Sequence, residues 1–282
     1  MNLTVKKLLL GMGMTLCLAT AHGLNLDELK NKASELKNKT DELRKQGKSA
    51  GLVGYSDEEE AAIGRQIAGS LLGAAPLVKD KALQKYVNNV GRWVASQSER
   101  PDLPWHFGVI ESADINAFAA PSGYIFVTRG MYRLLGDESE LAGVLAHEVG
   151  HVIRRHHLKI LQQSQMVDMG GKLLTKRVGD DDQIRKLIGS GAEIVSRSLD
   201  QNAEFEADRI AVVLAARAGY DAFGLPQVLQ EIGHAGDDSS VALLFKTHPH
   251  PEERLSRLGD AMDSRFDGLK GQALAGRFYR IK

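Results

Sequence analysis

One stretch decides how this chain is interpreted: Glu140-Leu-Ala-Gly-Val-Leu-Ala-His147-Glu148-Val-Gly-His151-Val-Ile-Arg-Arg155. Two histidines four residues apart on an α-helix differ by about 400° of rotation and about 6 Å of rise, so both imidazoles project from one face. One metal ion can therefore bind both rings. Glu148 would lie beside that ion without binding it, which is where a base for a metal-activated water belongs.

The residues around this HExxH pattern predict a helix from Asp137 to about His157. Asp137 is a typical N-cap, and Glu140 is its expected capping-box partner. A core stripe, separate from the histidine face, is supplied by Leu141, Leu145, Val149 and Val152. The alternative is a core or surface helix that carries two histidines by chance.

Composition allows a folded protein with a substantial core, either as one domain or as a domain with a helical extension. The chain has 282 residues, of which 43% are hydrophobic. Its formal net charge is zero. A general nucleic-acid binder needs a basic surface to attract phosphate, so we expect no nucleic acid as a partner.

The N-terminus has the three parts of a secretory signal peptide. A basic start at residues 1–7 is followed by an apolar run at residues 8–20 and by Ala19-Thr20-Ala21, an A-x-A cleavage site. The run is short for a membrane span. We predict cleavage after Ala21 (signal peptide 1–21) and a periplasmic or secreted protein of 261 residues.

The only cysteine, Cys17, lies inside this signal, so the mature chain would form no disulfide and have no thiol ligand. The alternative is a lipoprotein attached through Cys17. The bulky Leu16 directly before it fits such a site poorly, which favours the cleaved signal.

Residues 22–54 predict a polar amphipathic helix followed by a linker. Leucine and alanine recur at spacings of three and four at Leu26, Leu29, Ala33 and Leu36. Such a helix could bind a partner or associate peripherally with a membrane. The alternative that we favour is a solvated helix folded onto its own domain. The main domain, which contains the HExxH helix, would then span residues 55–282, and the sequence does not define the oligomeric state.

The first half of that domain predicts two helices and a small sheet. Ser56 and Glu59 form a capping box for a helix to about Leu72, and a second helix runs from Asp80 to about Ser98. Short segments rich in aromatic and β-branched residues follow at 105–110, 115–119 and 124–128. We expect an antiparallel sheet in which one strand lies along the metal cleft and pairs with an extended peptide, or one that only closes the core.

The second half is predicted to be almost wholly helical, and it supplies the third metal ligand. A short helix is expected at 129–135, and further helices at 158–178 and 183–198. Asp200 then caps an Ala/Val-rich helix on which Glu204 and Asp208 share one face. We predict Glu204 as the ligand and Asp208 as the acceptor that fixes a histidine N–H. The alternative is that both carboxylates form surface ion pairs, for instance with Arg209.

These residues resemble the zinc peptidases grouped with the prenyl-protein proteases and HtpX, in particular their soluble periplasmic bacterial members of the BepA and LoiP type. The resemblance covers residues 56–258 and is carried by four motifs. They are His-Glu-Val-Gly-His at 147–151, Glu-Phe-Glu-Ala-Asp at 204–208, Asn116-Ala-Phe-Ala with Gly123-Tyr-Ile-Phe-Val-Thr, and Thr247-His248-Pro-His-Pro-Glu-Glu-Arg254. The sequence departs from the family in having neither the membrane helices of the prenyl proteases nor a repeat-rich C-terminal domain.

The resemblance implies a mostly α (α+β) fold, a helical zincin-type core with a small β-sheet beside the active-site helix. It implies one Zn²⁺ per chain, and it agrees with the assignment from the residues: ligands His147, His151 and Glu204, and base Glu148. His248 would bind zinc in a resting state or stabilise the oxyanion, and Arg254 is a second candidate for the latter role. Substrate would lie along Asn116, Ala117 and Phe118. Five further histidines are assigned surface or structural roles: His106, His156, His157, His234 and His250.

The expected function is that of an exported zinc endopeptidase acting on protein or peptide substrates. Resemblance and compartment imply quality control of misfolded or misassembled envelope proteins; residue spacing does not show it. The alternative is a chaperone-like or binding module with an occluded, little-used zinc site. Glu148 favours the enzyme, because a binding module needs no base beside its metal.

Overall fold

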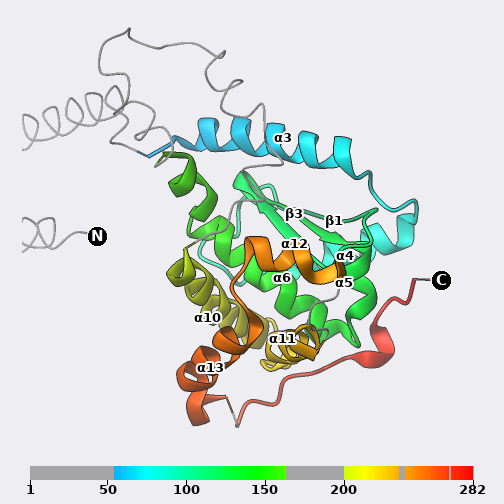
Figure 1. The fold of residues 1–282 in the computed structure, drawn as a ribbon, viewed down its shortest axis with the longest axis vertical. Coiled ribbons are helices and arrows are strands. Elements are labelled where there is room, and N and C mark those ends of the chain that lie inside the picture. Colours follow the sequence, from blue (N-terminus) through cyan, green and yellow to red (C-terminus); the bar gives the residue numbers. More distant parts are fainter. Residues whose placement is uncertain (1–53, 163–199, 235–238, 267, 282) are drawn as a thin grey trace, which may run out of the picture. The chain divides into compact units, whose positions relative to one another are not determined.

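The computed structural model describes residues 54–162, 200–234, 239–266 and 268–281 of the chain (Figure 1). The chain divides into two compact units, Met1–Val53 and Gly54–Lys282, and the described residues belong to the second. Three predictions fall outside the described residues. They are the signal peptide, residues 22–53 of the polar helix and linker, and the part of the later predicted helices that lies between residues 163 and 198. In the described ranges, no helix is both long and apolar enough to cross a membrane.

The described elements are mainly helical, as predicted, with three short strands between the early helices and the HExxH helix. In chain order they are α3 (Asp57–Ala74), α4 (Lys81–Ala95), β1 (His106–Ile110), β2 (Ala117–Ala120), η1 (Pro121–Gly123), β3 (Tyr124–Thr128), α5 (Arg129–Leu134), α6 (Glu138–Ile153), α10 (Gln201–Arg217), α11 (Gly224–His234), η2 (Ser239–Val241), α12 (Ala242–Thr247), α13 (Pro251–Met262), η3 (Asp263–Arg265) and η4 (Ala275–Arg277).

The first two helices begin where their capping residues predict. The Ser56 hydroxyl accepts a hydrogen bond from the Glu59 backbone, and the Glu59 carboxylate accepts one from the Ser56 backbone, completing the capping box of α3. Asp80 caps α4 by accepting from two backbone N–H groups. The buried face of α4 carries Leu83, Val87, Val90 and Val94 and packs on β1.

The sheet of the described region is mixed, so the prediction of an antiparallel sheet is wrong for one of its two pairings. The strand order is β1-β3-β2, with β3 parallel to β1 and antiparallel to β2. The turn Pro121–Gly123 joins β2 directly to β3, with positive φ at Ser122 and Gly123, and a tight reversal makes neighbouring strands antiparallel. The return through β2 then gives β3 the direction of β1. This order leaves β2 at the edge, on the side next to α6.

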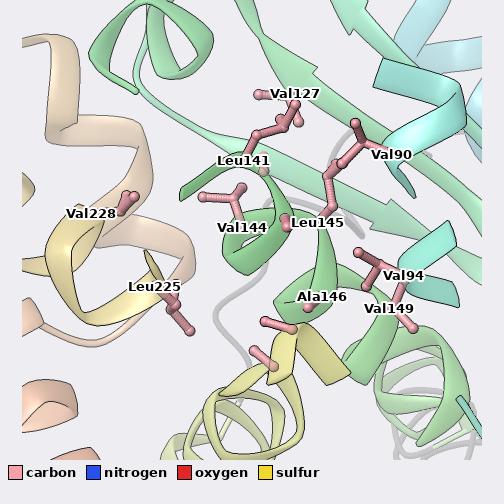
Figure 2. Packing of buried hydrophobic residues seen from close by; sticks show 14 of the residues in the cluster. Val90, Val94, Val127, Leu141, Val144, Leu145, Ala146, Val149, Leu225 and Val228 are labelled. Atoms are coloured by element: carbon pink, nitrogen blue, oxygen red, sulfur yellow. The ribbon is translucent and has the colours of Figure 1, made fainter. Parts of the chain in front are cut away.

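Helix α6 forms the centre of the core. Fourteen of its 16 residues are buried. Figure 2 shows Leu141, Val144, Leu145 and Val149 of α6 amid side chains from three other elements: Val127 of the sheet, Val90 and Val94 of α4, and Leu225 and Val228 of α11. Helix α10 packs along α6 at Gly150, where an added Cβ would come within 3.1 Å of the Ala207 Cα. A helix surrounded on so many sides holds its histidines in a rigid frame.

Both ends of α6 differ from prediction. At the start, Asp137 caps the helix as expected, but the Glu140 carboxylate accepts from the Gly136 N–H at 2.5 Å rather than from Asp137, so the capping box is not formed. At the end, the helix stops at Ile153 instead of continuing to His157. Arg155 has a φ of 55°, and helical structure resumes at residues 156–162.

Tertiary ion pairs accompany this break and can stabilise it. The Arg155 guanidinium lies 2.9 Å from the buried Glu60 carboxylate and 2.5 Å from Asp57, both on α3. Glu60 also accepts a bidentate pair of hydrogen bonds from Arg100. These contacts from residues far away in the sequence stabilise a left-handed backbone at Arg155 that an uninterrupted helix excludes.

Candidate metal centre

Three of the predicted ligands lie together between α6 and α10. The Nε2 atoms of His147 and His151 are 3.0 Å apart. From α10, the Glu204 carboxylate places Oε2 3.6 Å from Nε2 of His147 and Oε1 3.4 Å from Nε2 of His151. One donor atom from each of these residues and one from His248 lie within 4.8 Å of one another.

The side chains at this point fit a bound metal ion. Glu204 is 0% exposed, and neither carboxylate oxygen has a hydrogen-bond partner. A buried carboxylate without a partner costs several kcal/mol, which a cation between it and the two imidazoles would offset. Two histidine nitrogens and one carboxylate oxygen are also the protein ligands of a catalytic zinc site, in which the remaining position stays open for water or substrate.

Asp208 lies where the sequence predicted an acceptor for a ligand's N–H. Its Oδ1 is 2.8 Å from Nδ1 of His147, so we assign the proton to Nδ1, which leaves the Nε2 lone pair for a metal. Arg254 on α13 donates to both Asp208 oxygens, at 2.9 Å and 2.6 Å. Although burial opposes it, this guanidinium holds the pKa of Asp208 well below its usual range.

The same carboxylates raise the pKa of His147. Burial and the charge of Arg254 lower it, but Asp208 and Glu204 outweigh them and raise the pKa to about 9. Arg254 lies on the Nδ1 side of His147, and its Nε and Nη2 atoms both donate to Asp208. This position identifies Arg254 as an orienting group for Asp208 and does not favour the predicted oxyanion role.

Glu148, the predicted base, is only 3% exposed beside the ligands. Burial raises its pKa to about 7, helped by repulsion from Glu204 and opposed by the positive charges of His147 and Arg254. A carboxyl group that titrates near neutrality can both accept a proton and return it, which is what a general acid–base group requires.

His248 also reaches the site, as the family-like motif implied. It follows α12, and its Nε2 lies 3.9 Å from Glu204 Oε2. Its other ring nitrogen is 2.8 Å from the Thr247 hydroxyl, which fixes the ring. Burial lowers the pKa of His248 to about 4. A neutral imidazole at this place can act as a further ligand or donate a hydrogen bond to substrate.

The predicted substrate residues lie at the start of β2, the edge strand. The Asn116 side chain is fully buried; its Oδ1 accepts from the Ala117 N–H, and its Nδ2 has no partner. Ala117 is buried at the strand end. Phe118 is half-buried and packs against the apolar cluster that contains Ile63 and Ile67 of α3. The structure thus brings this strand beside α6, and its contact with substrate stays a prediction.

Two histidines that the sequence placed among the surface or structural residues are buried beside the centre. His156 and His157 are 3% and 7% exposed, and both rings approach His151. No local signal could have found them, because a straight helix through Arg155 would point them elsewhere. The exposed positions of His106, His234 and His250 agree with prediction.

An HExxH helix whose histidines face a glutamate from a following helix defines a metallopeptidase centre. The chain belongs to peptidase family M48, whose sequence model matches residues 81–262. This confirms the predicted family, and the mostly helical fold with a small sheet is the one expected of it.

Individual relatives agree with this assignment. The chain is 32% identical over 219 residues to the beta-barrel assembly-enhancing protease of Escherichia coli K12, covering 74% of this chain and 45% of the relative. It is 28% identical to the mitochondrial metalloendopeptidase OMA1 of Arabidopsis thaliana (66% of this chain, 37% of the relative) and 27% identical to the metalloprotease YcaL of E. coli K12 (57% and 63%). The chain spans about half the length, or less, of the first two.

Proposed function

We propose that this protein is an exported, zinc-dependent endopeptidase in which Glu148 is the general base. One observation carries the proposal. The buried carboxylate of Glu204 faces the Nε2 atoms of both HExxH histidines without a hydrogen-bond partner, and Glu148 lies beside them with a pKa raised to about 7. Membership of a peptidase family and relatives named as metalloproteases support the same reaction class.

In this mechanism His147, His151 and Glu204 would hold the metal, and Asp208 fixes the His147 ring. A bound zinc ion would supply Lewis-acid polarisation of the scissile carbonyl and an acidified water. Glu148 accepts the proton of the attacking water and passes it to the leaving amine. His248 is the candidate donor to the carbonyl oxygen in the transition state.

The edge of β2 is the proposed support for an extended substrate. Its inner edge pairs with β3, and within the described residues its outer edge has no strand partner. An extended peptide can add to such an edge through main-chain hydrogen bonds. Because this strand lies beside α6, the added peptide would pass near the histidines.

For compartment and substrate we propose the cell envelope and misassembled proteins there. The predicted signal peptide supports export, and the name of the first relatives, beta-barrel assembly-enhancing protease, supports a role in envelope quality control. Peripheral membrane association is compatible with the polar amphipathic segment at 22–54.

Cleavage of unfolded casein by the full mature chain tests the function. We expect cleavage to stop with a chelator and to resume on addition of zinc. Glu148→Gln should keep the metal and the fold but lose activity by about 10²- to 10⁴-fold, the usual contribution of a general base. Glu140→Gln on the same helix is the control and should remain active. Cleavage by Glu148→Gln at the wild-type rate would rule out the mechanism.

A further inference from the structure

The second HExxH histidine has a partner that the proposed mechanism does not use. Nδ1 of His151 lies 2.9 Å from Nδ1 of His156, and both rings are buried, at 1% and 3% exposure. On its other side, His156 Nε2 lies 3.4 Å from the Glu206 carboxylate. Glu206 is paired in turn with Arg154, whose Nε is 3.0 Å from Oε1. Side chains from α6, α10 and the turn after α6 thus form one chain of contacts ending at a predicted metal ligand.

We infer that His156, held by Glu206, is a positioning residue that fixes the ring orientation and tautomer of His151 for metal binding. This inference rests on the metal site proposed above and adds to it a pair of residues that act through a ligand.

The direction of the hydrogen bonds follows from the chemistry of the end groups. A carboxylate can only accept, so His156 carries its proton on Nε2 and donates it to Glu206. Nδ1 of His156 is then an acceptor, and His151 must donate to it from its own Nδ1. The Nε2 lone pair of His151 is thereby left facing Glu204 and His147, where a metal would bind.

The break in the chain after α6 is what makes this contact possible. Five residues along a straight helix correspond to about 500° of rotation, which would turn His156 about 140° away from His151. The left-handed backbone at Arg155 returns the chain toward α6 instead. The ion pairs that hold Arg155 against α3 therefore also place His156.

The two ligand histidines are thus oriented by different means. His147 donates directly to a buried carboxylate, that of Asp208. His151 reaches a carboxylate only through a second imidazole, and that carboxylate, Glu206, is 39% exposed. Both arrangements give the same tautomer, which is the function of groups behind a metal ligand.

Zinc affinity, measured by competition with a chromogenic chelator, tests the inference on the full mature chain without using peptidase activity. His156→Phe keeps the ring volume but removes both nitrogens, and we expect affinity to fall by about 10- to 100-fold, the usual effect of losing such a partner. His157→Phe is the matched control: its ring is also buried beside His151 but has no hydrogen bond to it, so affinity should be unchanged.

A spectroscopic measurement separates positioning from packing. With Co²⁺ in place of zinc, the visible absorption bands should shift in His156→Phe and not in His157→Phe, because only the former frees the His151 ring. His156→Asn, whose amide oxygen can occupy the place of Nδ1 and accept from His151, should recover part of the lost affinity. Wild-type affinity in His156→Phe, or an equal loss in both phenylalanine variants, would overturn the inference.

Glu206→Met, which keeps much of the side-chain length but removes the oxygen that accepts from His156, decides the case if His156→Phe does not fold. This partly exposed side chain does not touch His151, so a drop in zinc affinity there supports the chain of contacts, and unchanged affinity contradicts it. Failure of the proposed function is distinguishable: without the metal site the wild-type chain would bind no zinc in the competition assay, and without the peptidase activity it would bind zinc but not cleave casein.

Discussion

The buried pair of Arg254 and Asp208 should be one of the larger single contributions to stability. The two residues are 3% and 1% exposed, and they are joined by two hydrogen bonds of 2.9 Å and 2.6 Å. Arg254→Met keeps most of the apolar stem of the side chain but removes the guanidinium. Asp208 would then remain buried with the His147 ring as its neighbour on the other side.

The magnitude follows from this burial. Removing one partner of a buried ion pair usually costs about 3–5 kcal/mol, because an uncompensated charge remains. His147 can offset part of the loss by carrying a proton, since its pKa is raised to about 9, so we expect about 3 kcal/mol. Glu253→Gln on the same helix breaks only an exposed pair with Arg257 and should change stability by less than about 1 kcal/mol.

Urea unfolding followed by circular dichroism, with excess chelator so that metal binding does not contribute, measures both variants. The double variant Arg254→Met/Asp208→Asn should recover part of the loss, because the buried charge is then gone as well. A loss in Arg254→Met no larger than in Glu253→Gln would refute this reasoning.

Further predictions concern the ligand, the alkaline limit of stability and the helix contact. Glu204→Ala should abolish stoichiometric zinc binding in equilibrium dialysis, and full occupancy would refute the assignment of this ligand. Burial and then hydrogen bonding to Glu138 raise the pKa of Tyr86, and burial and the charge of Glu138 raise that of Tyr220. Both tyrosines therefore stay neutral in the folded chain where the unfolded chain ionises, so stability should be intact below about pH 10 and fall as the pH rises above it. Tyr86→Phe should make this fall shallower in urea unfolding between pH 9 and 11; an unchanged slope would contradict the argument. Gly150→Val should cost about 1–3 kcal/mol and weaken zinc binding, because its Cβ would press on the neighbouring backbone of α10, whereas Gly69→Val, with nothing within 4 Å, should change neither measurably.

The sequence identified the parts of the site that depend on local spacing. His147 and His151 share a face because they are four apart on a helix, and Glu204 and Asp208 do so for the same reason. An aspartate or serine marked the start of four described helices, at Ser56, Asp80, Asp137 and Asp200, where backbone N–H groups need an acceptor.

What the sequence could not show depends on contacts between distant residues. The helix ends at Ile153, and just beyond it Arg155 pairs with residues nearly a hundred positions earlier, on α3; nothing in the local sequence signals these contacts. The parallel pairing of β1 with β3 depends on which strand takes the centre of the sheet. The place of Arg254 behind His147, and not in front of it, follows from the packing of α13 against α10.

The packing of α6 also bears on what the metal does for the protein. Leu141, Leu145 and Val149 are fully buried among apolar side chains of other elements, and this burial stabilises the helix whether or not an ion is bound. Structural zinc sites, in contrast, supply much of the folding energy of a small domain. Because the core already fixes α6, a bound ion would contribute little to the stability of the fold. The packing of α6 with α10 therefore places His147, His151 and Glu204 together without help from an ion.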